Sequence, residues 1–88
     1  MKRKLNINID HVATLRQARQ GTYPDPIDTI EIIKKAKANG IVMHLREDRR
    51  HIQLNDLRRF KKKYKFHFNL EMAPTIDMIN IANKIKPD

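Results

Sequence analysis

"FHFNLEM", residues 66–72, alternates apolar and polar side chains along its whole length. Strict alternation predicts a β-strand that buries one face and keeps the other polar. Two further short strands are predicted upstream, in "IVMHL", residues 41–45, and in the alternating "LNINI", residues 5–9. The chain is thus predicted to contain three short strands.

Helices are predicted between and after the strands. Residues 11–20 fit a short helical turn, and a further helix is expected to begin at Pro26, with Asp25 as N-cap, and to end at Asn39 and Gly40. Gly40 is expected to end that helix as a left-handed cap. The residues expected on its apolar face are Ile27, Ile30, Ile33 and Ala36.

Two more helices are expected over residues 56–64, with Asn55 as N-cap, and over residues 76–85, with Thr75 as N-cap. The apolar face of the first of these is expected to hold Leu57, Phe60 and Tyr64. A strand followed by a helix, three times over, predicts parallel pairing with right-handed crossovers. The 88 residues are enough for one small α/β domain, residues 1–88.

The chain is strongly basic, with a net charge of +9. Such a charge permits binding to nucleic acid, an anionic membrane or phosphorylated small molecules. Nucleic acid is the less favoured partner, because aromatic residues are only 6% of the chain and do not interleave with the basic ones. The best candidate for a nucleic-acid-binding segment is "RRFKKKYK" at residues 58–65. A basic run of this kind is more often the solvated outer face of a helix.

Cysteine is absent, which excludes disulfides and thiolate metal sites. The histidines form no close helical pair, so no metal site is predicted. No apolar stretch approaches the roughly 18 residues of a membrane span, and the amino terminus does not resemble a signal peptide. No membrane partner is expected, and the cytoplasm is the expected location.

Polar side chains are richest at the carboxyl ends of the three predicted strands. Because side chains alternate along a strand, each strand has one polar row that either faces water or lines a site. In a (β/α)8 barrel such a row points inward, and its carboxyl-terminal end carries the chemistry. The end residues are Asp10 after the first strand, His44 and Arg46 on the second, and Glu71 on the third.

His44 and Glu71 are candidate general bases, since each can accept a proton near neutral pH in a suitable environment. Arginine offers a planar fork of donors to phosphate oxygens. The candidate phosphate-binding residues are Arg19, Arg46, Arg49, Arg50 and His51. The alternative for "REDRR", residues 46–50, is a solvated loop in which Glu47 and Asp48 pair with neighbouring arginines.

Four motifs, taken together, resemble the N-terminal part of the pyridoxine 5'-phosphate synthase family. They are "NIDHVATLRQAR" at residues 8–19, "YPDP" at 23–26, "HLREDRRHI" at 44–52 and "NLEMA" at 69–73. The resemblance implies a (β/α)8 TIM barrel, an oligomer, and no metal or organic cofactor. It also implies a transferase that condenses 3-amino-2-oxopropyl phosphate with 1-deoxy-D-xylulose 5-phosphate to give pyridoxine 5'-phosphate.

The resemblance also assigns roles to individual residues. His44 and Glu71 would be proton acceptors, and Asn8 and Arg19 would contact the 3-amino-2-oxopropyl phosphate. The residues implied to contact the deoxyxylulose phosphate are Asp10, His11, Arg46 and His51.

A complete barrel takes about 250 residues, so the chain is expected to hold only three of the eight βα units and to be inactive in isolation. Two alternatives stay open. One is a non-catalytic remnant that retains a capacity for phosphate ligands or protein partners. The other is a small basic nucleic-acid-binding domain.

Overall fold

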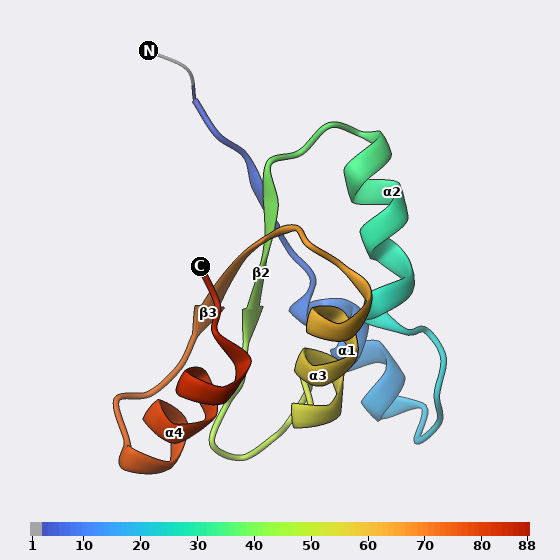
Figure 1. Ribbon diagram of the computed structural model, residues 1–88. Coiled ribbons are helices and arrows are strands. Elements are labelled where there is room, and N and C mark those ends of the chain that lie inside the picture. The colour runs from blue at the N-terminus through green and yellow to red at the C-terminus, as the bar shows by residue number, and fades with distance from the viewer. Residues whose placement is uncertain (1–2) are drawn as a thin grey trace.

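Three parallel strands form a single sheet in the computed structural model, which describes residues 3–88 (Figure 1). The strands are β1 (Asn6–Asn8), β2 (Gly40–His44) and β3 (His67–Glu71), in that spatial order. In β2, Gly40 pairs with both Asn6 and His67, and His44 pairs with Glu71. The predicted strands and their parallel pairing are therefore confirmed, with bounds that differ by one residue at each end.

Helices join these strands and cover one face of the sheet. They are α1 (Asp10–Ala18), the 3₁₀ helix η1 (Pro26–Thr29), α2 (Ile30–Lys35), α3 (Leu54–Lys63) and α4 (Ile76–Ile85). On the covered face, Ile41, Met43 and Phe68 are fully buried, whereas Asn69 and Glu71 on the other face are exposed. The predicted division into an apolar and a polar face is thus confirmed.

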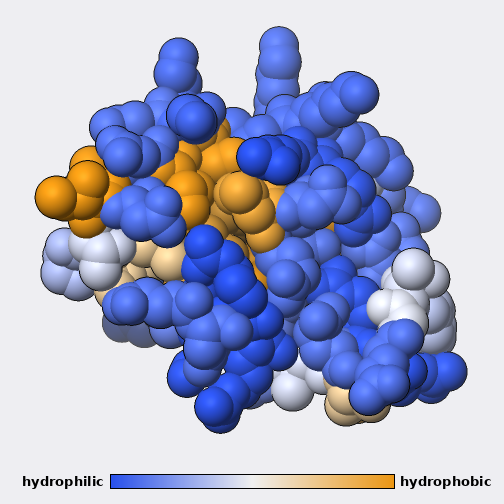
Figure 2. All heavy atoms as spheres, turned by 90° about the horizontal axis from the view of Figure 1, so that it is seen from below, coloured by the Kyte–Doolittle hydropathy of each residue, from blue (hydrophilic) through white to orange (hydrophobic). Residues whose placement is uncertain are grey.

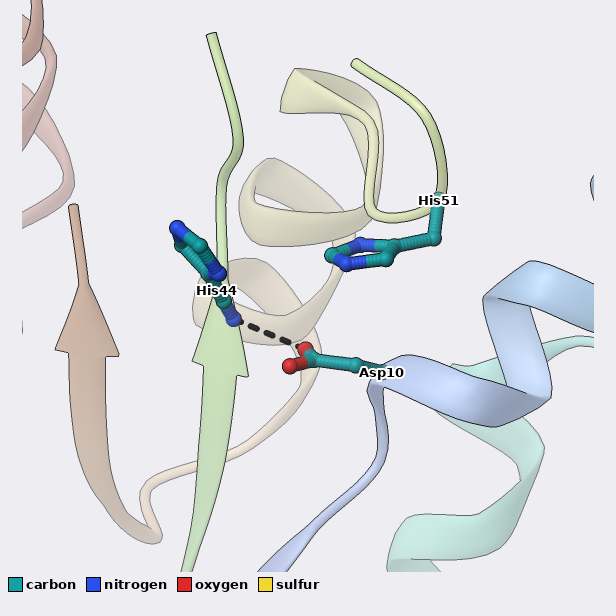
Figure 3. Close-up of side chains that lie close together, drawn as sticks. All are labelled: Asp10, His44 and His51. Atoms are coloured by element: carbon teal, nitrogen blue, oxygen red, sulfur yellow. Dashed lines mark hydrogen bonds between the residues drawn. The ribbon is translucent and has the colours of Figure 1, made fainter. Parts of the chain in front are cut away.

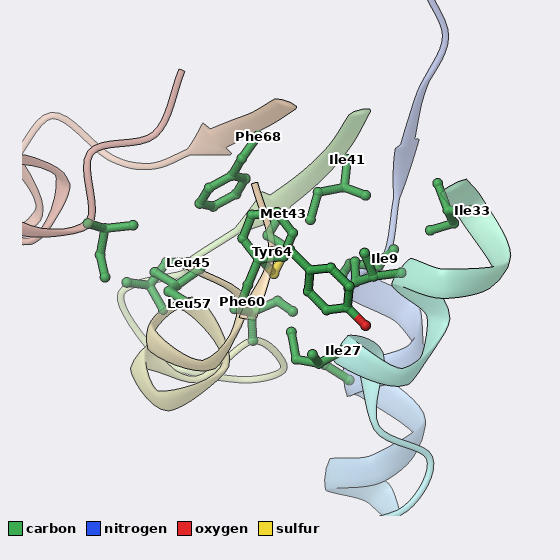
Figure 4. Packing of buried hydrophobic residues seen from close by; sticks show 14 of the residues in the cluster. Ile9, Ile27, Ile33, Ile41, Met43, Leu45, Leu57, Phe60, Tyr64 and Phe68 are labelled. Carbon is green, nitrogen blue, oxygen red and sulfur yellow. The ribbon is translucent and has the colours of Figure 1, made fainter. Parts of the chain in front are cut away.

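The core lies between the sheet and the helices (Figure 4). Phe60 of α3 packs edge-on against Phe68 of β3, with ring centroids 5.2 Å apart. Leu57 of α3 is fully buried, and Tyr64, just after the helix, is nearly so. Burying each such side chain contributes about 1.5–3 kcal/mol, so this small sheet depends on its helical cover.

Two of the predicted helix caps are confirmed. The Asp25 carboxylate accepts a hydrogen bond from the Ile27 N–H at 3.1 Å, and Pro26 is the first residue of η1. The Thr75 hydroxyl accepts one from the Met78 N–H at 3.2 Å. Both caps satisfy an N–H group that a helix leaves without an intrahelical partner.

Two other helix predictions are wrong. Asn55 lies inside the first turn of α3, and the N-cap is Gln53, whose N–H donates to the Asp56 carboxylate at 2.8 Å. The Asp56 side chain can reach back over one turn, so the helix starts earlier than the Asn55 signal indicated. Ala36 is exposed, because α2 has already ended at Lys35.

Gly40 is not a helix cap, which corrects a further prediction. It is the first residue of β2, and Lys37 (φ 62°) takes the left-handed conformation instead. A Cβ on Gly40 would lie 2.5 Å from the His67 carbonyl oxygen and 2.8 Å from Asn6 Oδ1. Close approach of the two neighbouring strands, and not a turn, is what requires glycine here.

The chain returns to the outer edge of β3 after α4. The Asp88 N–H donates to the Phe68 carbonyl at 2.9 Å, and the Phe68 N–H donates to the Asp88 carboxylate, also at 2.9 Å. Backbone groups on a strand edge need such partners. Asp88 therefore satisfies both backbone groups of Phe68 on the outer edge of β3.

The end of the molecule at which the strands finish is mostly hydrophilic, with one apolar patch on the side where α4 lies (Figure 2). Ile76 and Ile79 of α4 are among the large apolar side chains that are exposed. Within residues 3–88, no helix has the length and apolar character needed to cross a membrane.

Candidate active site

Several of the predicted site residues lie where the three strands end. Asp10 begins α1 directly after β1, His44 is the last residue of β2, and Glu71 is the last residue of β3. His44 and Glu71 are direct register partners. Because the strands are parallel, their carboxyl ends share one edge of the sheet, and this edge brings the polar groups together.

Asp10, His44 and His51 form a tight cluster (Figure 3). One carboxylate oxygen and one ring nitrogen from each histidine lie within 4.8 Å of one another. The two imidazole rings meet edge to face, with centroids 5.9 Å apart. The His44 backbone N–H donates to Asp10 Oδ1 at 2.7 Å, which joins β2 to the start of α1.

Asn8 holds the other side of the Asp10 carboxylate. Its side-chain amide donates to Asp10 Oδ2 at 3.0 Å, and its Oδ1 accepts from the Asp10 N–H at 2.7 Å. Asp10 is only 7% exposed, and each of its carboxylate oxygens has a donor. A buried carboxylate satisfied in this way is fixed in orientation and keeps free lone pairs for a further donor.

His51 enters the cluster from the loop between β2 and α3. The Ile52 N–H donates to His51 Nδ1 at 2.7 Å, so the neutral ring carries its proton on Nε2. Burial lowers the pKa of His51; the charge of Asp10 opposes this, and His44, Arg46 and His11 add to it. The neutral imidazole, an Nε2–H donor, is therefore the favoured form near neutral pH.

This tautomer argues against a metal centre. Two histidines and a carboxylate are a common ligand set for divalent transition metals. A ligating nitrogen must offer a lone pair, whereas His51 uses the lone pair of Nδ1 to accept from Ile52 and carries a proton on Nε2. The cluster as built is suited to donating a hydrogen bond to an oxygen atom.

The arginine-rich loop pairs largely with itself. Arg46 donates to both Asp48 carboxylate oxygens, at 3.0 and 3.1 Å, and Arg50 approaches the same carboxylate at 3.5 Å. The hydrogen bond from Arg46 lowers the pKa of Asp48 to about 2. Arg49, with φ of 52°, donates its N–H and its guanidinium to the Arg46 carbonyl.

The self-pairing expected for this loop is thus confirmed for Asp48. Glu47 was expected to pair as well, but it forms no ion pair with any residue of the described chain. Next to this loop is a hollow of about 300 Å³, whose lining residues are His44, Arg46, Glu47, Asp48 and Ala73.

Not all of the predicted site residues come together. His11 lies in the first turn of α1, next to Asp10, and is exposed. Arg19 follows the last residue of α1, and its guanidinium lies 5.7 Å from the centroid of the Tyr23 ring. Since nine helical residues span about 13 Å, Arg19 lies a helix length away from Asp10.

The sequence did not single out Arg16 and Asp56, which support the cluster from behind. The Arg16 guanidinium donates to both Asp56 carboxylate oxygens, at 2.7 and 2.8 Å, and to the His51 carbonyl at 3.1 Å. Asp56 raises the pKa of Arg16, and both side chains are buried. The only sequence signal was weak: Arg16 lies one helical turn after Ala13, on the face that α1 buries.

Comparison with known proteins shows the family. The family model described as "Pyridoxal phosphate biosynthesis protein PdxJ" matches residues 5–88. Proteins named pyridoxine 5'-phosphate synthase are 56% identical in Geotalea uraniireducens and in Geobacter sulfurreducens, each over 97% of this chain and 36% of the relative. The Coxiella burnetii protein of the same name is 53% identical, over 97% of this chain and 35% of the relative.

The chain thus spans about a third of the length of the curated relatives that it matches. The motifs that resembled this family lie within the matched residues, and the resemblance is confirmed. The chain belongs to the PdxJ family of pyridoxal phosphate biosynthesis proteins.

Proposed function

We propose that the chain forms part of a pyridoxine 5'-phosphate synthase, a transferase that acts on two phosphorylated small molecules. The reaction condenses 3-amino-2-oxopropyl phosphate with 1-deoxy-D-xylulose 5-phosphate and releases phosphate and water. The observation that carries this proposal is the cluster of Asp10, His44 and His51 at the carboxyl ends of parallel strands. The names of the relatives support the same activity.

We propose further that the three βα units are part of a (β/α)8 barrel, which takes about 250 residues. The exposed polar face of the sheet supports this, because in a closed barrel that face points to the interior. The exposed Ile76 and Ile79 of α4 would then pack against further units. We propose also that the complete barrel assembles into an oligomer, as the family resemblance implies.

His44 and Glu71 are the proposed proton acceptors. They lie side by side on β2 and β3, at the edge where a substrate would sit. Ring closure requires attack of an amine on a carbonyl, followed by several proton transfers and dehydrations. Two bases with different surroundings, one half-buried and one exposed, can serve different transfers.

The proposed binding groups divide by their geometry. Asn8, Asp10 and His51 present fixed polar atoms, and His11 lies beside them in α1. Arg46 is the proposed phosphate ligand of the deoxyxylulose phosphate, with the phosphate displacing Asp48 from its guanidinium. Arg19 is the proposed contact of the 3-amino-2-oxopropyl phosphate. Because Arg19 lies beyond the far end of α1, this role requires the substrate to reach it in the assembled site. No metal or organic cofactor is part of the proposal.

A segment exchange tests the proposal. Residues 5–88 would replace the matching segment of the Geobacter sulfurreducens relative, and formation of pyridoxine 5'-phosphate from both substrates would be measured. We expect the hybrid to be active and the isolated chain to be inactive. His44→Gln in the hybrid should abolish activity, whereas His67→Gln, at the amino end of β3, should retain it. A folded hybrid without activity would contradict the proposal.

A further inference from the structure

A buried ion pair lies directly behind the His51 backbone. We propose that Arg16, held by Asp56, is a positioning residue that fixes His51 as an Nε2–H donor facing Asp10 and His44. The inference deepens the proposed function, and the role of His51 toward a substrate rests on that function.

The Arg16–Asp56 pair is shielded from solvent. Arg16 is 7% exposed and Asp56 is 2% exposed, and the two join by two parallel N–H···O bonds. Removing two charges from water is costly, and a buried pair often stabilises a fold no more than apolar residues of similar size would. The pair therefore calls for a role other than stability.

The pair holds the backbone that follows His51. Arg16 Nη2, which also donates to Asp56, donates to the His51 carbonyl at 3.1 Å, and the Gln53 side chain donates to the same carbonyl at 3.1 Å. The Gln53 N–H donates in turn to Asp56. Arg16 and Asp56 thus clamp the backbone on both sides of Ile52, which is itself fully buried.

The held backbone in turn orients the His51 imidazole. With its backbone clamped, Ile52 aims its N–H at His51 Nδ1, at 2.7 Å. This bond assigns the ring proton to Nε2 and limits rotation of the ring. Of the groups around the ring, Asp10 is anionic, Arg46 is cationic, and His44 and His11 are titratable. In this setting a fixed N–H donor suits a hydroxyl or phosphate oxygen of a substrate.

Nuclear magnetic resonance of the ¹⁵N-labelled chain tests the inference without substrate, so its failure is distinct from failure of the proposed function. In the unmodified chain, we expect a single Nε2–H tautomer for His51, a titration midpoint below that of histidine in a peptide, and slow exchange of the Ile52 amide. In Arg16→Lys, which keeps the charge and loses the fork, we expect a higher midpoint and at least tenfold faster exchange.

Two further variants complete the test. Arg16→Gln combined with Asp56→Asn removes both charges together and should behave as Arg16→Lys does. Lys61→Gln is the control: it removes a cation that donates to the Lys86 carbonyl, a contact that involves neither Arg16 nor Asp56, and it should leave His51 and Ile52 unchanged. Folded Arg16 variants with an unchanged His51 would overturn the inference, as would a His51 that titrates like an exposed histidine in the unmodified chain. Loss of folding in both Arg16 variants would also overturn it, because the pair would then be structural.

Discussion

The backbone N–H of His44 donates to the side chain of Asp10 at 2.7 Å, which links the last residue of β2 to the first residue of α1. The two residues are 34 positions apart in the chain. One carboxylate thus both orders the edge of the sheet and presents its remaining lone pairs to the cluster.

Asp10→Asn should destabilise the fold and weaken the cluster. An amide cannot accept at both positions, so either the His44 N–H or the Asn8 side chain loses its acceptor. Leaving one partly buried donor unpaired costs about 1–3 kcal/mol in the free energy of unfolding. Urea denaturation measures this cost. Asp28→Asn, an exposed change on η1, is the control and should stay within about 0.5 kcal/mol of the parent.

Gly40→Ala should destabilise the sheet. The new methyl group would meet the His67 carbonyl oxygen at 2.5 Å, and backbone of a neighbouring strand cannot move away without loss of pairing. Overpacking of this kind costs about 1–3 kcal/mol. Gly21→Ala is a matched control, since the nearest atom to its Cβ would be 3.9 Å away. Equal unfolding midpoints for the two variants would refute the prediction.

The sequence predicted the sheet well, because alternation along residues 66–72 and the strand–helix order depend on local pattern alone. It misplaced Gly40, since a glycine after a helix is usually a cap and only the register reveals the close contact with His67. The Arg16–Asp56 pair joins positions 40 apart. A charged residue on a short helix is usually solvated, so no local pattern marks such a partner.

The cluster of Asp10, His44 and His51 was predictable in part. Strand ends in a parallel sheet meet at one edge, so Asp10 and His44 could be placed together from topology. His51 lies on a loop seven residues beyond β2, and its position depends on hydrogen bonds to Ile52, Gln53 and Arg16 that only the three-dimensional structure shows.

Arg46→Gln should raise the pKa of Asp48 from about 2 toward its ordinary value near 3.8, because the hydrogen bond from Arg46 is the main cause of the lowered value. A carboxyl with a lowered pKa in the folded state stabilises that state above its unfolded pKa and loses the contribution as pH falls. The stabilisation of the folded state by ionised Asp48 should therefore disappear between about pH 4 and pH 2 in the parent chain. The carboxyl carbon shift of Asp48 reports both midpoints, and Arg50→Gln should change the midpoint less, since its contact is longer.

His51→Gln should flatten the pH dependence of stability in the weakly acidic range. The pKa of His51 is lowered in the folded state, chiefly by burial, so the unfolded chain binds its proton first as pH falls. The contribution of the neutral ring is fully present above the unfolded pKa of about 6.5 and is lost as pH falls through the lower, folded value. Denaturation between pH 5 and pH 8 should show stability rising with pH more steeply in the parent than in the variant. His67→Gln, at an exposed position, is the control for loss of a histidine, and parallel curves for the parent and His51→Gln would show that the His51 ring is not held neutral by the fold.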